Sequence, residues 1–107
     1  MMEEIVLLET IKVLGKTRRT FKMTFAGAEF DMVIFDEKLG TCECYEIKHS
    51  DQIAAQQTKH LTDEICLKEA ERRFGSITKR CVIYRGADAT LENGIIYRNV
   101  EEYLKAL

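Results

Sequence analysis

The sequence has no long apolar run and no pattern of a secretory leader. None of its apolar stretches approaches the ~20 residues that a membrane-spanning helix needs. Its N-terminus has no basic region followed by an apolar segment of the signal type. These absences argue against a membrane partner, and we expect a cytoplasmic location.

The chain also lacks a strong excess of either charge. Its formal net charge is −2 and its sequence pI is near 5.7. It therefore has no overall basic field of the kind that drives tight nonspecific binding to nucleic acid. Basic side chains do gather within residues 16–22 and 72–80, and each group is either a local patch for nucleic acid or a solvated charged face.

Cysteines occur without the paired spacing of a structural zinc site. Cys42 and Cys44 are separated by one residue in an apparent strand, whereas Cys66 and Cys81 are isolated. We expect four reduced thiols, some of them buried as small hydrophobic groups.

What the chain does have is the composition of one globular domain. Apolar residues make up 46% and charged residues 32% of its 107 residues, a balance typical of globular proteins. A chain of this length supports one hydrophobic core. We expect a single domain over residues 1–107, with no internal repeats.

Hydrophobic periodicity predicts three helices in this domain. Apolar residues recur at helical intervals in residues 2–14, 54–74 and 100–107. Gly15 and Gly75 follow the first two segments directly and are typical helix terminators.

Alternation and short apolar runs predict five strands, at residues 20–25, 29–36, 41–48, 80–84 and 94–97. Ala26, Gly27 and Ala28 form a short connection, residues 36–40 form a turn, and a polar loop joins the last two strands. The order α-β-β-β-α-β-β-α predicts an α/β fold with a mixed sheet flanked by helices.

Two of these strands carry side chains with chemical potential. Alternation along residues 41–48 places Glu46 and Lys48 on one face with Cys42 and Cys44, and places Tyr45, Ile47 and His49 on the other. Along residues 29–36, alternation places Phe30, Met32 and Ile34 on one side and Asp31 with Val33 on the other. Each strand thus presents an acidic residue to one side of the sheet.

Antiparallel pairing across the turn would bring these acids together. Asp31 would then stand beside Glu46, because opposed residues on one face lie ~4.5–5.5 Å apart. Two buried carboxylates next to Lys48 predict a Mg²⁺ site that hydrolyses phosphodiesters. The alternative is a half-exposed cross-strand ion pair without function.

Residues 27–31 (Gly-Ala-Glu-Phe-Asp) and 45–50 (Tyr-Glu-Ile-Lys-His-Ser) resemble the PD-(D/E)XK nuclease superfamily. Within it, the chain is similar over nearly its whole length to the C-terminal domain of bacterial and archaeal AAA-type ATPases of unassigned function. The resemblance implies a restriction-endonuclease-like fold, with Asp31 and Glu46 as ligands of Mg²⁺ or Mn²⁺. It further implies the backbone carbonyl of Ile47 as a third ligand and Lys48 as the catalytic lysine.

The resemblance also implies accessory residues. Members often have a glutamate on the first helix, which would be Glu4 or Glu9; these lie five residues apart, so only one can point inward. A glutamine in the helix after the lysine strand would be Gln56 or Gln57, with a polar helix face as the alternative. His49 and His60 are expected to be satisfied surface or core histidines rather than ligands.

Two functions follow from these expectations. The first is a Mg²⁺-dependent DNA endonuclease or exonuclease domain; the second is a catalytically silent nuclease-fold module that binds a protein or nucleic acid and regulates an ATPase. The sequence has no G-x-x-x-x-G-K-[ST] loop, so we expect the ATPase domain elsewhere in a longer parent chain. The doubled Met1-Met2 fits a trimmed fragment. A third interpretation is an antitoxin-like or purely structural α/β protein, and the oligomeric state stays open.

Overall fold

The fold follows from a computed structural model that describes residues 2–25 and 28–107. The predicted connection at Ala26 and Gly27 lies outside the described residues, as does Met1. In chain order the elements are α1 (Met2–Leu14), β1 (Arg19–Phe25), β2 (Ala28–Asp36), β3 (Thr41–Ile47), the 3₁₀ helix η1 (Ala55–Thr58), α2 (Lys59–Thr62), α3 (Glu64–Phe74), β4 (Ser76–Tyr84), β5 (Ala89–Thr90), β6 (Ile96–Asn99) and α4 (Val100–Ala106).

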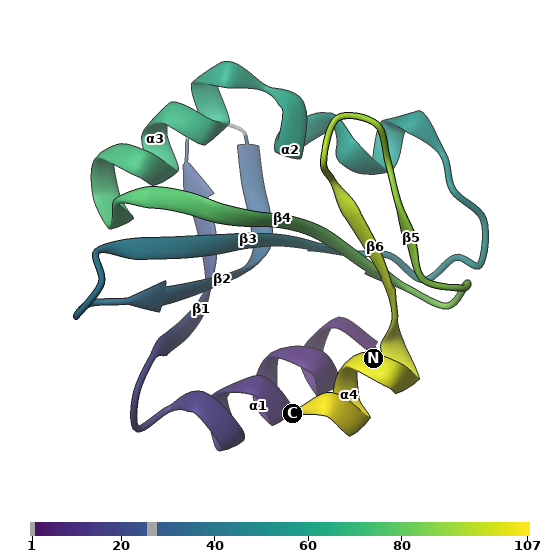
Figure 1. Ribbon diagram of the computed structural model, residues 1–107, viewed down its shortest axis with the longest axis horizontal. Coiled ribbons are helices and arrows are strands. Elements are labelled where there is room, and N and C mark those ends of the chain that lie inside the picture. Colours follow the sequence, from purple (N-terminus) through teal and green to yellow (C-terminus); the bar gives the residue numbers. More distant parts are fainter. Residues whose placement is uncertain (1, 26–27) are drawn as a thin grey trace.

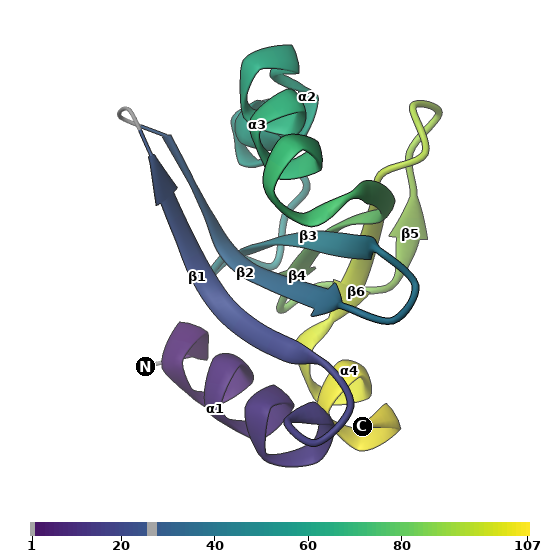
Figure 2. The same cartoon turned by 90° about the vertical axis from the view of Figure 1, so that its left-hand side faces the viewer.

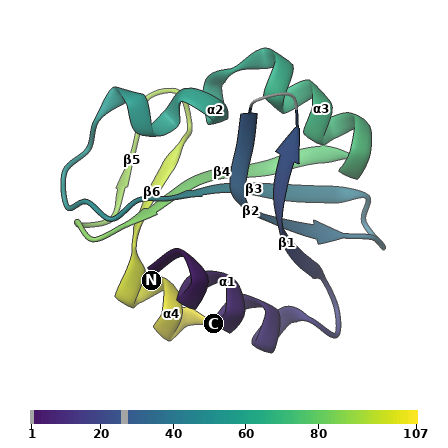
Figure 3. The same cartoon turned by 180° about the vertical axis from the view of Figure 1, so that it is seen from behind.

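The strands form one mixed sheet with the order β1-β2-β3-β4-β6-β5. β1, β2 and β3 pair antiparallel, β3 pairs parallel with β4, β4 pairs parallel with β6, and β5 runs antiparallel at the far edge. Helices α2 and α3 cover one face, and α1 and α4 lie side by side on the other (Figures 1 and 3). The predicted α/β class with a mixed sheet flanked by helices is therefore confirmed.

Each face of the sheet packs its own core. The α2/α3 face buries Cys42 and Cys44 of β3 with Leu61 and other apolar side chains. The α1/α4 face buries Tyr45 and Ile47 of the same strand. The alternation predicted along β3 is thus confirmed, because successive side chains of a strand point to opposite faces. All four cysteines are buried and free of disulfide bonds.

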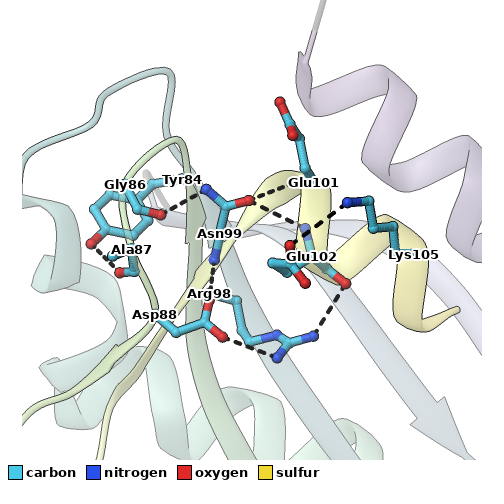
Figure 4. A network of polar contacts seen from close by, with 9 residues as sticks. All are labelled: Tyr84, Gly86, Ala87, Asp88, Arg98, Asn99, Glu101, Glu102 and Lys105. Atoms are coloured by element: carbon cyan, nitrogen blue, oxygen red, sulfur yellow. Dashed lines mark hydrogen bonds and ion pairs between the residues drawn. The ribbon is translucent and has the colours of Figure 1, made fainter.

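Polar contacts fix α4 at the ends of β4 and β6 (Figure 4). The Asn99 side chain accepts hydrogen bonds from the backbone N–H groups of Glu101 and Glu102, which caps the helix. It also donates to the carbonyl of Gly86, at 2.8 Å, and Asp88 accepts from the backbone N–H of Asn99, at 2.7 Å. This network is structural, since its hydrogen bonds fix the entry into α4.

The predicted single helix over residues 54–74 is wrong in its continuity. Asp63 has an extended backbone and its carboxylate accepts from the N–H groups of Ile65 and Cys66. A side chain that caps a helix start in this way ends the preceding turn and begins a new helix. The segment is therefore divided into η1, α2 and α3.

The strands after α3 also differ from the prediction. The last predicted strand, at residues 94–97, is β6 at Ile96–Asn99. β4 begins at Ser76 rather than at residue 80, because Thr41 and Cys42 of β3 pair with Ser76 and Ile77. β5 falls inside the predicted polar loop and is held only by its pairing with β6. Within residues 2–25 and 28–107 no helix is long and apolar enough to span a bilayer, and α1, the longest, has 13 residues.

Candidate active site

A β-bulge in β2 shapes the region around Asp31. Phe21 of β1 pairs with Val33 and Met23 pairs with Phe30, so one extra residue of β2 lies between these two pairs. As a result Phe30 and Val33 join the core on the α2/α3 face, while Met32 joins the core on the other. The predicted alternation that grouped Phe30 with Met32 is wrong for this reason. Bulges re-aim side chains in this way and often lie beside active sites.

Asp31 lies where β2 and β3 separate. The last pair of the ladder is Met32 with Tyr45, and beyond it β2 runs away from β3 toward the tip of the β1–β2 hairpin (Figure 2). The buried Asp31 side chain takes over the next ladder position, because its Oδ2 accepts a hydrogen bond from the N–H of Ile47 at 2.8 Å. A carboxylate is thereby held rigidly at the splayed end of the pair.

Lys48 completes an ion pair at the same place. Its Nζ lies 4.0 Å from Oδ2 of Asp31, and its side chain is 36% exposed. The backbone N–H of Lys48 donates to the carbonyl of Ile83 in β4, so the lysine is fixed at the end of β3. The ammonium is thus placed between a buried carboxylate and solvent.

Glu46 is the most enclosed member of the cluster. Only 2% of it is exposed, and its Oε1 lies 2.8 Å from Nδ1 of His60 in α2. Burial raises the pKa of Glu46 to about 9, the neighbouring Asp31 carboxylate raises it as the next cause, and the ammonium of Lys48 lowers it. The two buried carboxylates therefore favour a positive charge beside them.

A divalent cation at these groups would have few side-chain ligands. No set of three His, Cys, Asp or Glu side chains in the described part of the chain could hold a metal ion. An ion here would depend on Asp31, Glu46, a backbone carbonyl and water, which is how Mg²⁺ is commonly bound. The N–H of Ile47 faces Asp31, and in a strand the carbonyl of a residue faces the same neighbour as its N–H. The Ile47 carbonyl therefore points to the same side as its N–H, toward Asp31.

The accessory glutamates have their contacts elsewhere. Glu4 is exposed and Glu9 pairs with Lys12 at 3.4 Å, both on α1, which packs on the opposite face of the sheet from His60 and Glu46. Their role in the site stays a prediction. Another α1 carboxylate, Glu3, pairs with Lys22 of β1 instead, and no sequence pattern singled it out.

Lys22 links Glu3 to the rim of the site. Its Nζ lies 3.3 Å from Glu3 and 3.7 Å from Glu29. Glu3 first, then Glu29 and more weakly Asp31, raise the pKa of Lys22. The helix α1 thus contributes one carboxylate to a charged rim beside β1 and β2.

The two glutamines differ in environment. Gln56 is exposed, whereas Gln57 is buried. The Oε1 of Gln57 accepts from the N–H of Ala54 at 3.0 Å and from the Tyr97 hydroxyl at 2.8 Å, and its Nε2 donates to the carbonyl of Gln52 at 3.0 Å. These contacts give Gln57 a structural task in the loop that precedes α2.

Of the two histidines, His60 belongs to the site and His49 is exposed. His60 thus has a hydrogen-bonding partner, as expected of a satisfied histidine, but its contact with Glu46 was not predicted. The sequence signal for this contact is the neighbouring residue Leu61. Leu61 is completely buried in the core on the sheet face that carries Glu46, so the short helix α2 packs against that face.

A cavity of about 820 Å³ opens beside His60 along α2 and α3. Phe25 and other groups line it together with four cationic and two carboxylate side chains. These charged residues are Lys59, Lys68, Arg72, Arg73, Asp63 and Glu69. Asp63 caps α3, and Glu69 holds Arg72 and Arg73 at 2.6 and 2.7 Å. The cavity is therefore locally basic in a chain whose net charge is −2.

The two basic segments of the sequence thus have different surroundings. In residues 16–22, Arg18, Arg19 and Lys22 all face carboxylates within 4.0 Å, which agrees with a solvated charged face. In residues 72–80, Arg72 and Arg73 line the cavity next to the site.

No family model, no curated protein and no solved structure matches the chain.

Proposed function

We propose that the chain is a metal-dependent nuclease-like domain of the PD-(D/E)XK type, acting on DNA phosphodiesters and belonging to a longer chain with an AAA-type ATPase. The observation that supports this function is the convergence of Asp31, Glu46 and Lys48 at the splayed end of β2 and β3. The hairpin of β2 and β3, followed by a helical crossover to the parallel strand β4, supports a restriction-endonuclease-like arrangement.

Each residue has a role that its surroundings allow. Asp31, Glu46 and the Ile47 carbonyl would hold Mg²⁺ or Mn²⁺, which when bound supplies Lewis-acid activation of a phosphoryl oxygen and of water. Lys48 reaches solvent from its place beside Asp31 and can donate to the attacking water or to a phosphate oxygen. The basic cavity along α3 can hold the flanking phosphates of a polyanion.

A second function, a catalytically silent module that binds a partner and regulates the ATPase, is favoured by one contact. The Oε1 of Glu46 is engaged by His60 at 2.8 Å, and Glu46 is almost completely enclosed. An ion would therefore use the other carboxylate oxygen or displace the imidazole. Metal binding and cleavage are separate questions for this reason.

The first test measures metal binding through stability. A ligand with a Kd of about 1 mM, present at about 10 mM, stabilises the folded state by about 1.4 kcal/mol, which for a domain of this size raises Tm by roughly 6–10 °C. We expect this rise for wild type in Mg²⁺ or Mn²⁺ relative to EDTA and its loss in Asp31→Asn. Asparagine keeps an oxygen acceptor for the N–H of Ile47, so this variant should fold. An unchanged Tm of wild type in both metals would exclude the metal site.

The second test is cleavage of double- and single-stranded DNA with Mg²⁺. Wild type is compared with Lys48→Ala and with Lys38→Ala, an exposed lysine at the β2–β3 turn. Cutting that is lost only in Lys48→Ala supports the nuclease. Equal background cutting by all three proteins, together with a metal-dependent Tm, supports the silent module.

A further inference from the structure

The cavity along α2 and α3 has apolar walls as well as cationic ones. Phe25, at the end of β1, and Ile65 of α3 line it beside the basic side chains. Ile65 is 76% exposed, although every other exposed residue of α3 is charged. A ligand in this cavity therefore meets apolar surface and positive charge together.

The positive charge of the cavity is available to a ligand. Its two carboxylates are already engaged, because Asp63 caps α3 and Glu69 pairs with two arginines. Lys59 and Lys68 are exposed, and within residues 2–25 and 28–107 neither forms an ion pair. The cavity therefore favours an anionic ligand.

Arg73 adds a planar group that is held in place. Its Nε donates to Glu69 at 2.7 Å, and its guanidinium carbon lies 5.5 Å from the centroid of the Phe25 ring. A guanidinium has five N–H donors, so others remain for a ligand. Guanidinium planes stack on nucleic-acid bases and also donate to phosphates. Arg73 thus favours a nucleotide over an acidic peptide, whose carboxylates offer charge but no ring to stack.

The size of the cavity favours an unpaired nucleotide. Its volume of about 820 Å³ is in the range of pockets that enclose small molecules. The bases of a duplex are paired and stacked, and a base enters a pocket only after it has been flipped out at a cost in free energy. A single strand offers its bases without that cost.

We propose that the cavity binds unpaired nucleotides of single-stranded DNA next to the candidate site. His60 connects the two, because it lines the cavity and its Nδ1 lies 2.8 Å from Oε1 of Glu46. A strand that lies along α3 thus leads to the cluster of Asp31, Glu46 and Lys48. The inference rests on the proposed function for the place of the scissile phosphate, but binding itself requires neither metal nor cleavage.

The test is fluorescence anisotropy in EDTA with three labelled probes. These are an oligo-dT strand of about twelve nucleotides, which is within the usual site size, a blunt duplex of the same length and an oligoglutamate peptide of similar charge. Wild type should bind the strand at least about tenfold more tightly than the duplex, which must unpair a base. It should also bind the strand at least about tenfold more tightly than the peptide, which cannot stack.

Arg73→Lys separates stacking from charge. Lysine keeps the positive charge and loses the planar guanidinium, so the Kd for the strand should rise about fivefold. The log–log salt dependence should stay unchanged, because the number of phosphate contacts is the same. Arg19→Lys is the matched control and should leave the Kd unchanged, since Arg19 pairs with Glu37 away from the cavity.

Ile65→Ala tests the apolar wall. It should raise the Kd for the strand about threefold, because less apolar surface is covered by the bound base. Leu39→Ala is the matched control: Leu39 is 74% exposed, in the β2–β3 turn, and its loss should have no effect. Both side chains are exposed, so the fold should be retained, as thermal melting of each variant shows.

The inference is overturned if wild type binds the duplex or the peptide as tightly as the strand, or binds none of the three probes. It is also overturned if Arg73→Lys and Ile65→Ala are no weaker than their controls. Cleavage of duplex DNA without a preference for the strand would refute this inference alone and leave the proposed nuclease standing. Strand binding without any effect of metal on Tm would support the inference and refute the metal site.

Discussion

Replacing Glu46 by glutamine should make the metal-free protein more stable. Glutamine has nearly the same shape and can still form a hydrogen bond with His60, but it removes one of two adjacent buried carboxylates. Loss of a buried hydrogen-bonding residue usually destabilises a protein. The opposite sign is expected here because Glu46 is destabilising whenever it is charged.

The magnitude follows from the pKa. An ordinary glutamate has a pKa of 4.5, and burial with the Asp31 carboxylate raises the pKa of Glu46 to about 9 in the folded state. Between these values the folded state binds more protons than the unfolded state, so stability falls as pH rises through this window. At pH 7 the pH lies about 2.5 units above the ordinary pKa, and each unit corresponds to a loss of about 1.4 kcal/mol of folding stability. Together these give about 3–4 kcal/mol; local relaxation reduces this total, and we expect a gain of about 2–3 kcal/mol for Glu46→Gln.

The assay is thermal melting in EDTA from pH 5 to pH 8.5. For a domain of this size the gain corresponds to a rise in Tm of at least about 6 °C at pH 7, shrinking toward zero at pH 5. Glu92→Gln, in an exposed turn, is the control and should leave Tm unchanged at every pH. A Glu46→Gln variant that is less stable than wild type at pH 8, or a difference independent of pH, would refute the electrostatic reasoning.

Two further predictions concern the scaffold and the cavity. Gly75→Ala should cost more than about 2 kcal/mol in a urea melt, because Gly75 has φ +87° and an added Cβ would lie 1.9 Å from a backbone oxygen of the β2–β3 turn. Gly94→Ala has the same φ but only an ordinary contact with the Arg80 side chain at 3.6 Å, and it should cost about 1 kcal/mol. Lys59→Glu/Lys68→Glu should weaken DNA binding and make its log–log salt dependence shallower by about two, as measured by fluorescence anisotropy. Lys38→Glu should change neither quantity.

Much of the fold could be predicted because local pattern and tertiary structure agree. Alternation along residues 41–48 predicted both faces of β3, and Gly15 marked the end of α1. The break at Asp63 was missed since apolar residues continue at helical intervals on both sides of it. The first residues of β4 were missed because most of them are polar and they become a strand only through pairing with β3. Long-range pairing of this kind leaves no local signal.

The central residues of the candidate site could be predicted from the sequence, but much of their surroundings could not. Pairing of two neighbouring strands was enough to place Asp31 near Lys48, since a tight turn joins those strands. The bulge at Asp31 depends on the register with β1, which no single-strand pattern contains. His60 reaches Glu46 only because α2 is short and returns over the sheet. These two features came from tertiary contacts.

The places where the chain departs from local rules lie together. The bulge, the interrupted helix and the enclosed acid pair all surround Glu46. Elsewhere the helix cap at Asn99 and the two apolar cores follow ordinary preferences. Sequences that specify one fold break such rules mainly where function requires it. The electrostatic cost of Glu46 falls when a cation binds beside it, so the same residue that destabilises the free protein would provide the affinity for metal.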